Sequence, residues 1–543
     1  MEYRLIEEDE SDNSRETSPH NSIFEDSVIP NDIDLIKIYN YFLYKGYYNI
    51  VSIQLINLIT TLFLYFLFLI LVLCVDYKGL IELRINEKYM SDYIHIENLM
   101  NYNFFYIMCM ILMSIYTLIR IQGIIVDILK YKNIRTFFKD ELNITSKKIS
   151  TITWNNILDV LQKKYGKEFN AFSINSRILR KDNIMCDLFR TKLNKFLYSS
   201  LMEWNLSYCI FNNIIDENNQ VFLELYTNTD KVKKDIRKNM FIISCLTFIF
   251  MPFLMLYVIF YSLLKYGANF YNHPSKIVAR QWSLRARWQY RYYNELKHNL
   301  DSRLDISSIY AKEYCNQFNS KVIQTITKFI VFLASSFFIL LIFLSLINEH
   351  LLFNLNITQD KPIIWYMGIL GSFIALGKNI NSERKINGVS ESFEKLSCKI
   401  KYIPFEWKNI YDSLKIKNKI IKFYEYQIVT LFKECLLVIT VPFTLLYLCN
   451  YIEPIVEFIK ENIEDNISLG YISKKSNIKD IKDNSDIKTI ISFKEFRQNH
   501  PNWGENIEEF LVNSDIFSNL KNKDIVFEKE HKQLIIESGI SII

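Results

Sequence analysis

The stretch Ile53–Val75, IQLINLITTLFLYFLFLILVLCV, decides the fold class, because it contains no charged residue over 23 positions. As an α-helix it would extend about 34 Å, enough to cross the roughly 30 Å hydrocarbon core of a bilayer. Three further uncharged runs of similar length are Asn98–Ile119, Phe241–Leu264 and Phe329–Ile347. The sequence therefore predicts an all-α polytopic membrane protein.

The composition also favours long helices. Only 12 Gly and 9 Pro occur among 543 residues, whereas these two residue types make up roughly 12% of an average protein. This scarcity disfavours β-barrels, β-sandwiches and glycine-rich phosphate loops. The net charge is only +5, so we expect no nucleic acid among the partners.

Two shorter runs leave the number of crossings open. Pro362–Gly377 and Cys435–Asn450 each contain 16 uncharged residues, about 24 Å of helix, which is short for a crossing. Pro442 lies in the second of these runs, and Pro252 lies inside Phe241–Leu264. A central proline removes a helix hydrogen bond and can break the helix. The sequence thus allows either six crossings with mild kinks, or four crossings and two re-entrant helices kinked at the prolines.

The distribution of basic residues predicts the orientation. Loop Asp76–Asn103 carries three basic and five acidic residues, whereas Lys130–Lys238 and Lys265–Lys328 are dense in Lys and Arg. Positively charged segments tend to remain in the cytosol. We therefore expect the loop in the lumen and both termini in the cytosol.

The chain lacks the motifs of common catalytic sites. It contains no GxxxxGK[ST] loop, no GxSxG elbow and no HExxH sequence, so nothing indicates ATP hydrolysis or hydrolase chemistry. Its nine cysteines and seven histidines are scattered, without the spacing of a metal site. We expect no catalytic residue, no metal and no cofactor, and transport must proceed downhill or by coupling to an ion.

Five stretches around the apolar runs carry more specific information. They are DIDLIKIYNYFLYKGYYNI at residues 32–50, with VDY at 75–77; RILRKDNIMCDLF at 177–189; EWNLSYCIFNNIIDENNQV at 203–221; NFYNHPSKIVARQWSLRARWQYRYYNELKHNLDSRL at 269–304; and SFKEFRQNHPNW at 492–503. In order and spacing they resemble the autophagy-related protein 9 family.

The resemblance implies a function that composition does not show. It implies a domain-swapped homotrimer with four transmembrane helices and two re-entrant membrane helices in each protomer. The implied activity is ATP-independent scrambling of membrane phospholipids between leaflets during autophagosome membrane expansion. Implied partners are a bridge-like lipid-transfer protein and the scaffold and kinase-complex proteins of autophagy. The implied locations are the phagophore assembly site and Golgi-derived cytoplasmic vesicles, with endosome and endoplasmic reticulum as further compartments.

Two other functions compete with scrambling. The first is a vesicle-borne membrane scaffold that recruits autophagy partners without significant lipid movement. The second, an ion channel or coupled transporter, is weaker, because the interiors of the longest apolar runs contain no charge to bind a coupling ion.

The fourth stretch supplies a candidate lipid path. If residues 280–304 form one helix, five polar side chains fall within about 80° of one another at 100° per residue. They are Arg280, Arg287, Arg291, Glu295 and His298. Arginine can bind phosphate through bidentate hydrogen bonds. The alternative is a solvated helix face on the cytosolic surface.

Other residues have structural alternatives as well. Phe493, Phe496 and Trp503 stand in an otherwise polar region, and we expect them to dock on the protein's own cytosolic face or on a partner. For the basic residues Arg177, Arg180 and Lys181, packing and surface charge are favoured over lipid binding. Gln54 and Asn57, in the first apolar run, either line a path or bond to a neighbouring helix.

The sequence divides the chain into nine segments. The N-terminal part comprises a disordered acidic cytosolic tail (1–32) and a first membrane module (33–126), with crossings at about 53–75 and 102–122. The middle part comprises a cytosolic helical segment (127–239), a re-entrant helix (240–265), a second cytosolic helical segment (266–328) and a second membrane module (329–378), with crossings at about 329–347 and 362–377. The C-terminal part comprises a cytosolic helical segment (379–434), a re-entrant helix (435–450) and a cytosolic C-terminal tail (451–543) with the docking element at 492–503.

Overall fold

The computed structural model describes residues 30–501 and 503, apart from residues 71–73, 77–78, 80–93, 96–103, 192, 194–195, 197–198, 217, 273–278, 319–320, 348–355, 359–360, 381–387, 402–406, 408–409 and 478–486. Most of the expected N-terminal tail and the last forty residues lie outside the described part. Within it, the protein is predominantly helical, as the apolar runs and the scarcity of Gly and Pro predict.

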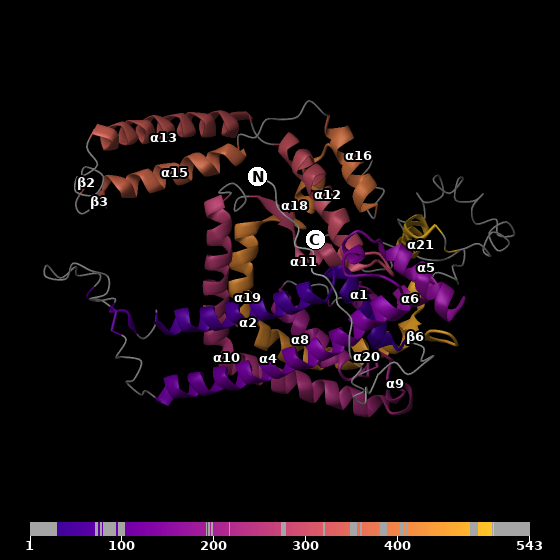
Figure 1. Ribbon diagram of the computed structural model, residues 1–543. Helices are drawn as coiled ribbons and strands as arrows, with labels where there is room; N and C mark the ends of the chain where they lie inside the picture. The colour runs from indigo at the N-terminus through magenta and orange to yellow at the C-terminus, as the bar shows by residue number, and fades with distance from the viewer. Residues whose placement is uncertain are drawn as a thin grey trace, which may run out of the picture.

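Two pairs of apolar helices project from a helical body in the same direction (Figure 1). The first arm consists of α2 (Tyr47–Leu69) and α4 (Phe104–Thr136), which pack side by side. The second arm consists of α13 (Lys321–Ile347) and α15 (Ile363–Ile380). Between these two helices, β2 (Asn356–Thr358) pairs antiparallel with β3 (Lys361–Pro362). Both arms expose large apolar side chains, as expected for helices in contact with lipid.

Three stretches among the described residues are long and apolar enough to cross a membrane: Tyr47–Leu67, Gln324–Ile347 and Gln427–Asn462. A shorter apolar helix covers Ile363–Ile374. The described helices thus agree with a polytopic membrane protein, and the number of crossings stays a prediction.

Helices α10 (Thr229–Asn272) and α19 (Gln427–Leu448) pack against each other. In Figure 1 the first part of α10 runs along the bottom of the view, and its second part stands upright beside α19, across the direction of the two arms. Ser244 Oγ donates a hydrogen bond of 2.7 Å to the Pro442 carbonyl. Pro252 lies within α10 and Pro442 within α19, and neither proline ends its helix. Re-entrance at these prolines stays a prediction.

The body is built from shorter helices whose ends are often capped. Around the N-terminal half lie α1 (Asp32–Leu43), α5 (Trp154–Tyr165), α6 (Ala171–Ile178), α7 (Arg180–Phe189), α8 (Ser200–Phe211) and α9 (Glu224–Thr227). The C-terminal half adds α11 (Leu284–Tyr290), α12 (Lys297–Gln317), α16 (Val389–Ile400), α18 (Leu414–Ile421), α20 (Ile452–Asn462) and α21 (Ile487–Asn499). The side chains of Thr153, Ser199 and Ser283 accept hydrogen bonds from backbone amides in the first turns of α5, α8 and α11, which satisfies donors that have no partner inside the helix.

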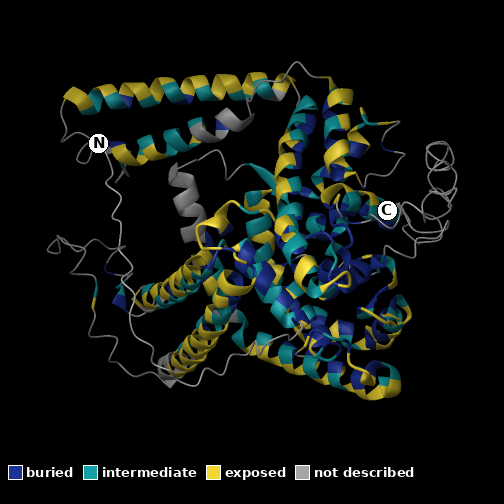
Figure 2. Cartoon of the chain, turned by 45° about the vertical axis from the view of Figure 1, so that its right-hand side comes forward, coloured by how far each residue is buried: buried dark blue, intermediate teal, exposed yellow. Residues whose placement is uncertain are grey.

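Buried residues concentrate in this body and not in the arms (Figure 2). One core cluster joins α7, α8, α10, α19 and α20, a second joins α1, α4, α5 and α6, and a third joins α11, α12, α16 and α18. The body also contains two short antiparallel strand pairs. Strand β1 (Arg280–Trp282) pairs with β4 (Tyr424–Tyr426), and β5 (Ile463–Asn466) pairs with β6 (Gly470–Ser473).

The structure corrects the expectation that residues 280–304 form one helix. Residues 280–282 are strand β1, α11 covers residues 284–290, and α12 begins only at Lys297. Arg291 has extended backbone angles (φ −66°, ψ 135°), and Asn294 has a left-handed φ of 57°, a conformation that asparagine tolerates better than most residues. The five polar side chains therefore do not share one helix face.

The structure also corrects the predicted start of the C-terminal tail at residue 451. Residues 452–476 form α20, the β5–β6 hairpin and a short 3₁₀ helix (Lys474–Ser476). Val456, Ile459 and Ile463 belong to the largest core cluster. Burial of these apolar side chains makes residues 452–476 part of the folded body.

Candidate functional site at the junction of five sequence stretches

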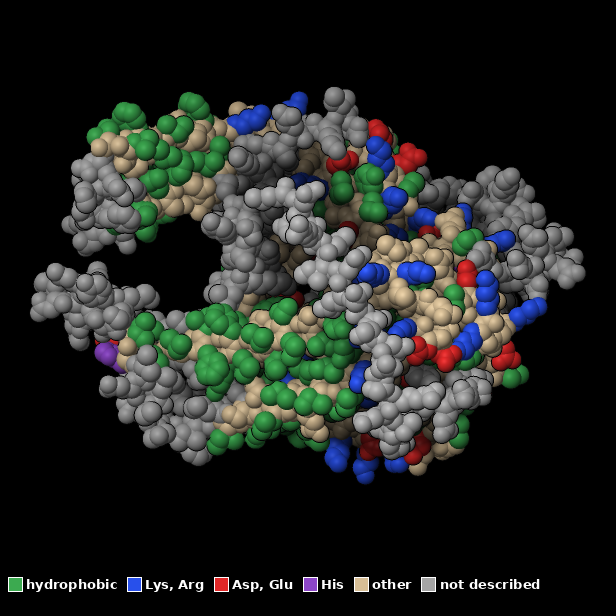
Figure 3. Space-filling view, viewed as in Figure 1, with side chains coloured by type: hydrophobic (Ala, Val, Ile, Leu, Met, Phe, Trp, Pro, Cys, Tyr) green, Lys and Arg blue, Asp and Glu red, His purple; other side chains and the backbone are tan. Residues whose placement is uncertain are grey.

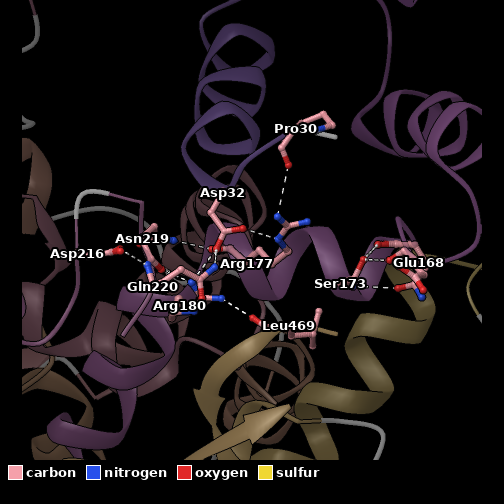
Figure 4. A network of polar contacts seen from close by, with 11 residues as sticks. Pro30, Asp32, Glu168, Ser173, Arg177, Arg180, Asp216, Asn219, Gln220 and Leu469 are labelled. Atoms are coloured by element: carbon pink, nitrogen blue, oxygen red, sulfur yellow. Dashed lines mark hydrogen bonds and ion pairs between the residues drawn. The ribbon is translucent and has the colours of Figure 1, made fainter. Parts of the chain in front are cut away.

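The N-terminal helix is attached to the body by a buried ion pair (Figure 4). Arg180 Nη1 donates a hydrogen bond of 2.7 Å to Asp32 Oδ2, and Arg177 Nε pairs with Asp32 Oδ1. The Arg180 side chain is completely buried. Burial lowers the pKa of Arg180, and the Asp32 carboxylate opposes this shift. The pair holds the start of α1 against α6 and α7.

Two more chain segments contact the same guanidinium group. Arg180 Nη1 also donates to the Asn219 carbonyl, and Nη2 donates to the Leu469 carbonyl at 2.6 Å. Gln220 Nε2 donates to Asp32 Oδ2 at 2.8 Å. The backbone at Gly470, whose φ is +68°, passes close to Gln220. A Cβ added at Gly470 would lie 2.6 Å from the Gln220 side-chain oxygen. Arg180 thus links segments from four parts of the sequence.

Asn294 forms a second polar contact centre. Asn183 Nδ2 donates to Asn294 Oδ1 at 2.8 Å, and the Asn294 amide donates to Asn183 Oδ1 at 3.0 Å. Asn294 Nδ2 donates to the Ser476 carbonyl at 2.8 Å. The turn between α11 and α12 is therefore fastened to α7 and to the chain after β6.

Asp187 forms a third centre in the same region. It accepts hydrogen bonds from Tyr293 Oη at 2.7 Å and from Ser473 Oγ at 2.5 Å. Burial raises the pKa of the Asp187 carboxyl. The backbone amide of Tyr293 donates to Ser492 Oγ at 3.0 Å, which connects the fourth stretch to the fifth. The five stretches, distant in sequence, therefore meet at one buried polar junction.

The candidate lipid-path residues separate into two groups. Arg291 and Glu295 are buried in the body, where Arg291 pairs with Asp182 at 2.7 Å and Glu295 pairs with Arg303 at 2.8 Å. His298 Nδ1 lies 2.9 Å from Tyr39 Oη, and burial lowers the pKa of the imidazole. These three side chains hold elements of the protein together.

Arg280 and Arg287 lie nearer the surface. The Arg280 guanidinium lies 4.1 Å from the centre of the Tyr426 ring, and it donates to Tyr426 Oη at 3.0 Å. Arg287 pairs with Asp301, and both side chains are 38% exposed. The structure does not bring the five residues together as a cationic wall. The proposed lipid path through them therefore loses the shared helix face on which it rested.

The aromatic element at residues 492–503 packs on the protein itself. Phe496 and Trp503 join Phe172 in a buried cluster, and Phe493 packs partly buried against it. The Asn175 amide nitrogen lies 3.2 Å from His500 Nε2, and Asn155 Nδ2 donates to the Asn499 carbonyl at 2.7 Å. Lys401 also pairs with Glu495. Helix α21 is thus fastened to α5, α6 and the end of α16.

The junction has the character of a closed structural network. Within the described residues, no group of three or more His, Cys, Asp and Glu side chains is arranged to hold a metal ion. The charged groups face one another instead of an open surface. Neither Asp32 nor Asn294 stands out in the sequence as a contact residue, and the predicted N-terminal tail includes Asp32. The only signal was that Asp32 opens the first of the five stretches.

Comparison with known proteins identifies the family. The family model described as "Autophagy protein ATG9" matches residues 31–479 of this chain. The chain belongs to this family. Autophagy-related protein 9 from Dictyostelium discoideum is 27% identical, over 91% of this chain and 76% of its own length. The Saccharomyces cerevisiae S288c protein is 26% identical over 82% of this chain, and the match spans only 47% of that longer relative.

The fold agrees with that of a solved ATG9 family structure. The cryo-electron microscopy structure of Schizosaccharomyces pombe Atg9 superimposes with a TM-score of 0.60, at 22% identity, over 82% of this chain and 98% of that chain. The family match includes four residues of the polar junction, because Asp32, Arg180, Asn294 and Leu469 all fall within residues 31–479. Family membership assigns this polytopic membrane protein to autophagy.

Proposed function

We propose that this chain is an ATP-independent phospholipid scramblase of autophagy vesicles, which redistributes lipids between leaflets during autophagosome membrane expansion. Membership of the ATG9 family supports the autophagy role. Lipid movement rests on one observation: the second part of α10, together with α19, lies across the direction of the two apolar arms (Figure 1).

This orientation bears on the cost of lipid exchange. A zwitterionic headgroup loses its hydration when it enters hydrocarbon, and this loss is the main barrier to spontaneous exchange. Helices that lie across membrane-crossing arms occupy one leaflet without spanning both. A membrane segment shorter than the hydrocarbon core can be accommodated by local thinning of the bilayer. The arrangement therefore favours a shortened polar passage that needs no ATP.

The separation of the two arms supports a domain-swapped homotrimer. Figure 3 shows an open space between the first arm and the second arm, with apolar side chains along both. Phe332, Phe343 and Leu346 of α13 are 65%, 63% and 80% exposed. An arm of a second protomer would cover such surfaces without contact to water. We therefore propose a trimer in which α2, α4, α13 and α15 cross the membrane and α10 and α19 are embedded without crossing.

Partners and locations follow from the family resemblance. We propose the phagophore assembly site and Golgi-derived vesicles as the places of action, with endosome and endoplasmic reticulum as further compartments. We also propose contacts with a bridge-like lipid-transfer protein and with the scaffold and kinase-complex proteins of autophagy. A lipid-transfer protein delivers lipid to one leaflet, and a scramblase would equalise the two leaflets.

Leaflet exchange in liposomes tests the proposed function. The purified full chain is reconstituted without ATP into liposomes with a fluorescent headgroup-labelled phospholipid, and a membrane-impermeant reductant is added outside. We expect the reductant to quench the label of both leaflets with the protein present, and of the outer leaflet alone in protein-free liposomes. If correctly inserted trimers leave the inner leaflet protected, scrambling is excluded and the scaffold function takes its place.

A further inference from the structure

One face of α2 is polar although the helix is otherwise apolar. Gln54, Asn57, Thr61 and Tyr65 recur at spacings of three or four residues and lie within about 80° of one another on the helix. The opposite face carries Ile59, Phe63 and Phe66, which are 63%, 58% and 58% exposed. The polar side chains therefore form a stripe along one side of the first arm.

Helix α4 presents a matching polar face. Tyr116, Arg120, Gly123 and Asp127 fall within about 60° of one another. Gln54 Nε2 donates a hydrogen bond of 3.1 Å to Asp127 Oδ2, and Arg135 Nη1 donates one of 3.2 Å to Tyr48 Oη. The two contacts fix an antiparallel register between α2 and α4. We call the line along which these two polar faces meet the α2–α4 seam.

The register sets charged groups of α4 beside the apolar span of α2. Both helices rise by the same amount, about 1.5 Å per residue. From the Gln54–Asp127 contact, this antiparallel register therefore sets Thr61 beside Arg120. The apolar span of α2 begins at Tyr47 and ends at Leu67. Arg120 is therefore level with a point about 21 Å from the end of that span next to the helical body. Asp127 is level with a point about 10 Å from the same end. Charged side chains within membrane-crossing helices are costly and usually mark a transport pathway.

The polar groups along the seam are incompletely satisfied. Arg120 and Asn57 are exposed, and the side chain of neither makes a hydrogen bond or ion pair with another residue of the described part. The Gln54 side-chain oxygen is buried and has no hydrogen-bond partner. Apart from its chain neighbours and the backbone of its own helix, a Cβ added at Gly123 would have no atom of the described residues within 4 Å. The seam thus combines unsatisfied polar groups with space beside the backbone.

We propose that the α2–α4 seam carries phospholipid headgroups through the bilayer, with Arg120 binding the phosphate and Asp127 binding the headgroup cation. This inference rests on the proposed scramblase function and names residues for it. The Arg120 guanidinium can donate two hydrogen bonds to a phosphate. The Asp127 carboxylate and the rings of Tyr65 and Tyr116 attract an ammonium group. Arg120 and Asp127 are about 10 Å apart along α4, so a headgroup visits them in succession.

The exchange assay described above tests the seam with matched variants of the full chain. G123L places a side chain in the space beside Gly123, and R120L removes the phosphate contact. We expect both variants to slow exchange by roughly tenfold, the factor that corresponds to one lost hydrogen bond to a charged group. R120K retains the charge and should be slowed less. The control is Q122L, a change of the exposed neighbour Gln122 on the other side of α4, which should exchange at the wild-type rate.

Two outcomes distinguish the seam from the function on which it rests. If wild-type protein moves no lipid, the scramblase function and the seam both fail. If wild-type protein is active and G123L and R120L are as fast as Q122L, the seam alone is wrong.

The accessibility of introduced cysteines tests the seam without measuring lipid exchange. It therefore remains informative if G123L or R120L fails to assemble. In reconstituted protein, N57C should react with a water-soluble thiol reagent at least about tenfold faster than I59C, because only the seam admits water. Both are compared with the background of the native cysteines. Equal labelling of the two positions would overturn the proposal.

Discussion

Arg180 Nη1 lies 2.7 Å from Asp32 Oδ2, and the side chains of both residues are at least 99% buried. The two residues are separated by 148 positions in the chain. Their contact fastens the helix that leads into the first apolar arm to the centre of the body. This buried ion pair, together with the apolar cluster that joins α1 to α4, α5 and α6, links the body to the membrane arm.

Removal of one member of this pair should be strongly destabilising. R180A leaves the Asp32 carboxylate buried without its main partner, and the loss of such a partner costs about 3–5 kcal/mol. We expect a marked drop in the thermal unfolding midpoint of the purified protein in detergent. K181A, which changes the exposed neighbouring residue, is the control. Equal midpoints for R180A and K181A would contradict a structural role of the pair.

His500 should make stability depend on pH. Burial, with a smaller effect of His298, lowers the pKa of His500 to about 4, whereas an unfolded histidine titrates near 6.5. The folded state therefore binds the proton less readily, and stability is lost as the pH falls from 6.5 towards 4. Protonation would also disturb the contact between His500 Nε2 and the Asn175 amide.

The size of this effect follows from the two pKa values. At pH 5 the His500 contribution should amount to a loss on the order of 2 kcal/mol relative to pH 8. H500Q should flatten the decrease of the unfolding midpoint between pH 8 and pH 5, and H95Q, at an exposed position, should not. An unchanged pH profile of H500Q would show that His500 does not titrate in this range.

The aromatic cluster of the C-terminal element should contribute unequally. Phe496 and Trp503 are 4% and 8% exposed, and truncation of buried aromatic side chains costs about 3–5 kcal/mol. F496A and W503A should each release α21 and increase the proteolysis of this helix. F493A removes a partly buried ring and should have a smaller effect. Similar protease sensitivity of all three variants would argue against packing of this cluster in solution.

Arg291 and Arg287 should differ although they are four residues apart. Arg291 is buried, pairs with Asp182, and lies 5.3 Å from the centre of the Trp288 ring. R291L should therefore lower stability by about 2–3 kcal/mol. The Arg287–Asp301 pair is partly exposed, so R287L should cost less than about 1 kcal/mol. Thermal unfolding of the two single variants checks this, and an intact R291L midpoint would contradict the burial of Arg291.

The amino-acid sequence alone is sufficient to predict the fold class and the family. Residues 53–75 hold no charge, and a helix is the spanning structure that satisfies every backbone hydrogen bond within one segment. This local rule predicts α2 and α13 without knowledge of their neighbours. The five stretches likewise indicated the family that residues 31–479 match. The aromatic residues of 492–503 stood out because they interrupt a polar region.

Tertiary structure decided what the charged residues do. At 100° per residue, Arg280 to His298 can form a helical stripe, but β1 pairs with β4 about 145 positions away, and Asn294 bonds to Asn183 and Ser476. These distant partners favour a broken chain over one helix, because each buried polar group gains a hydrogen bond that it would otherwise lack. The same reason places Asp32 in the core, since its partner Arg180 and the Leu469 carbonyl are brought together only by folding. Local patterns define helices, whereas the pairing of buried charges depends on which segments meet.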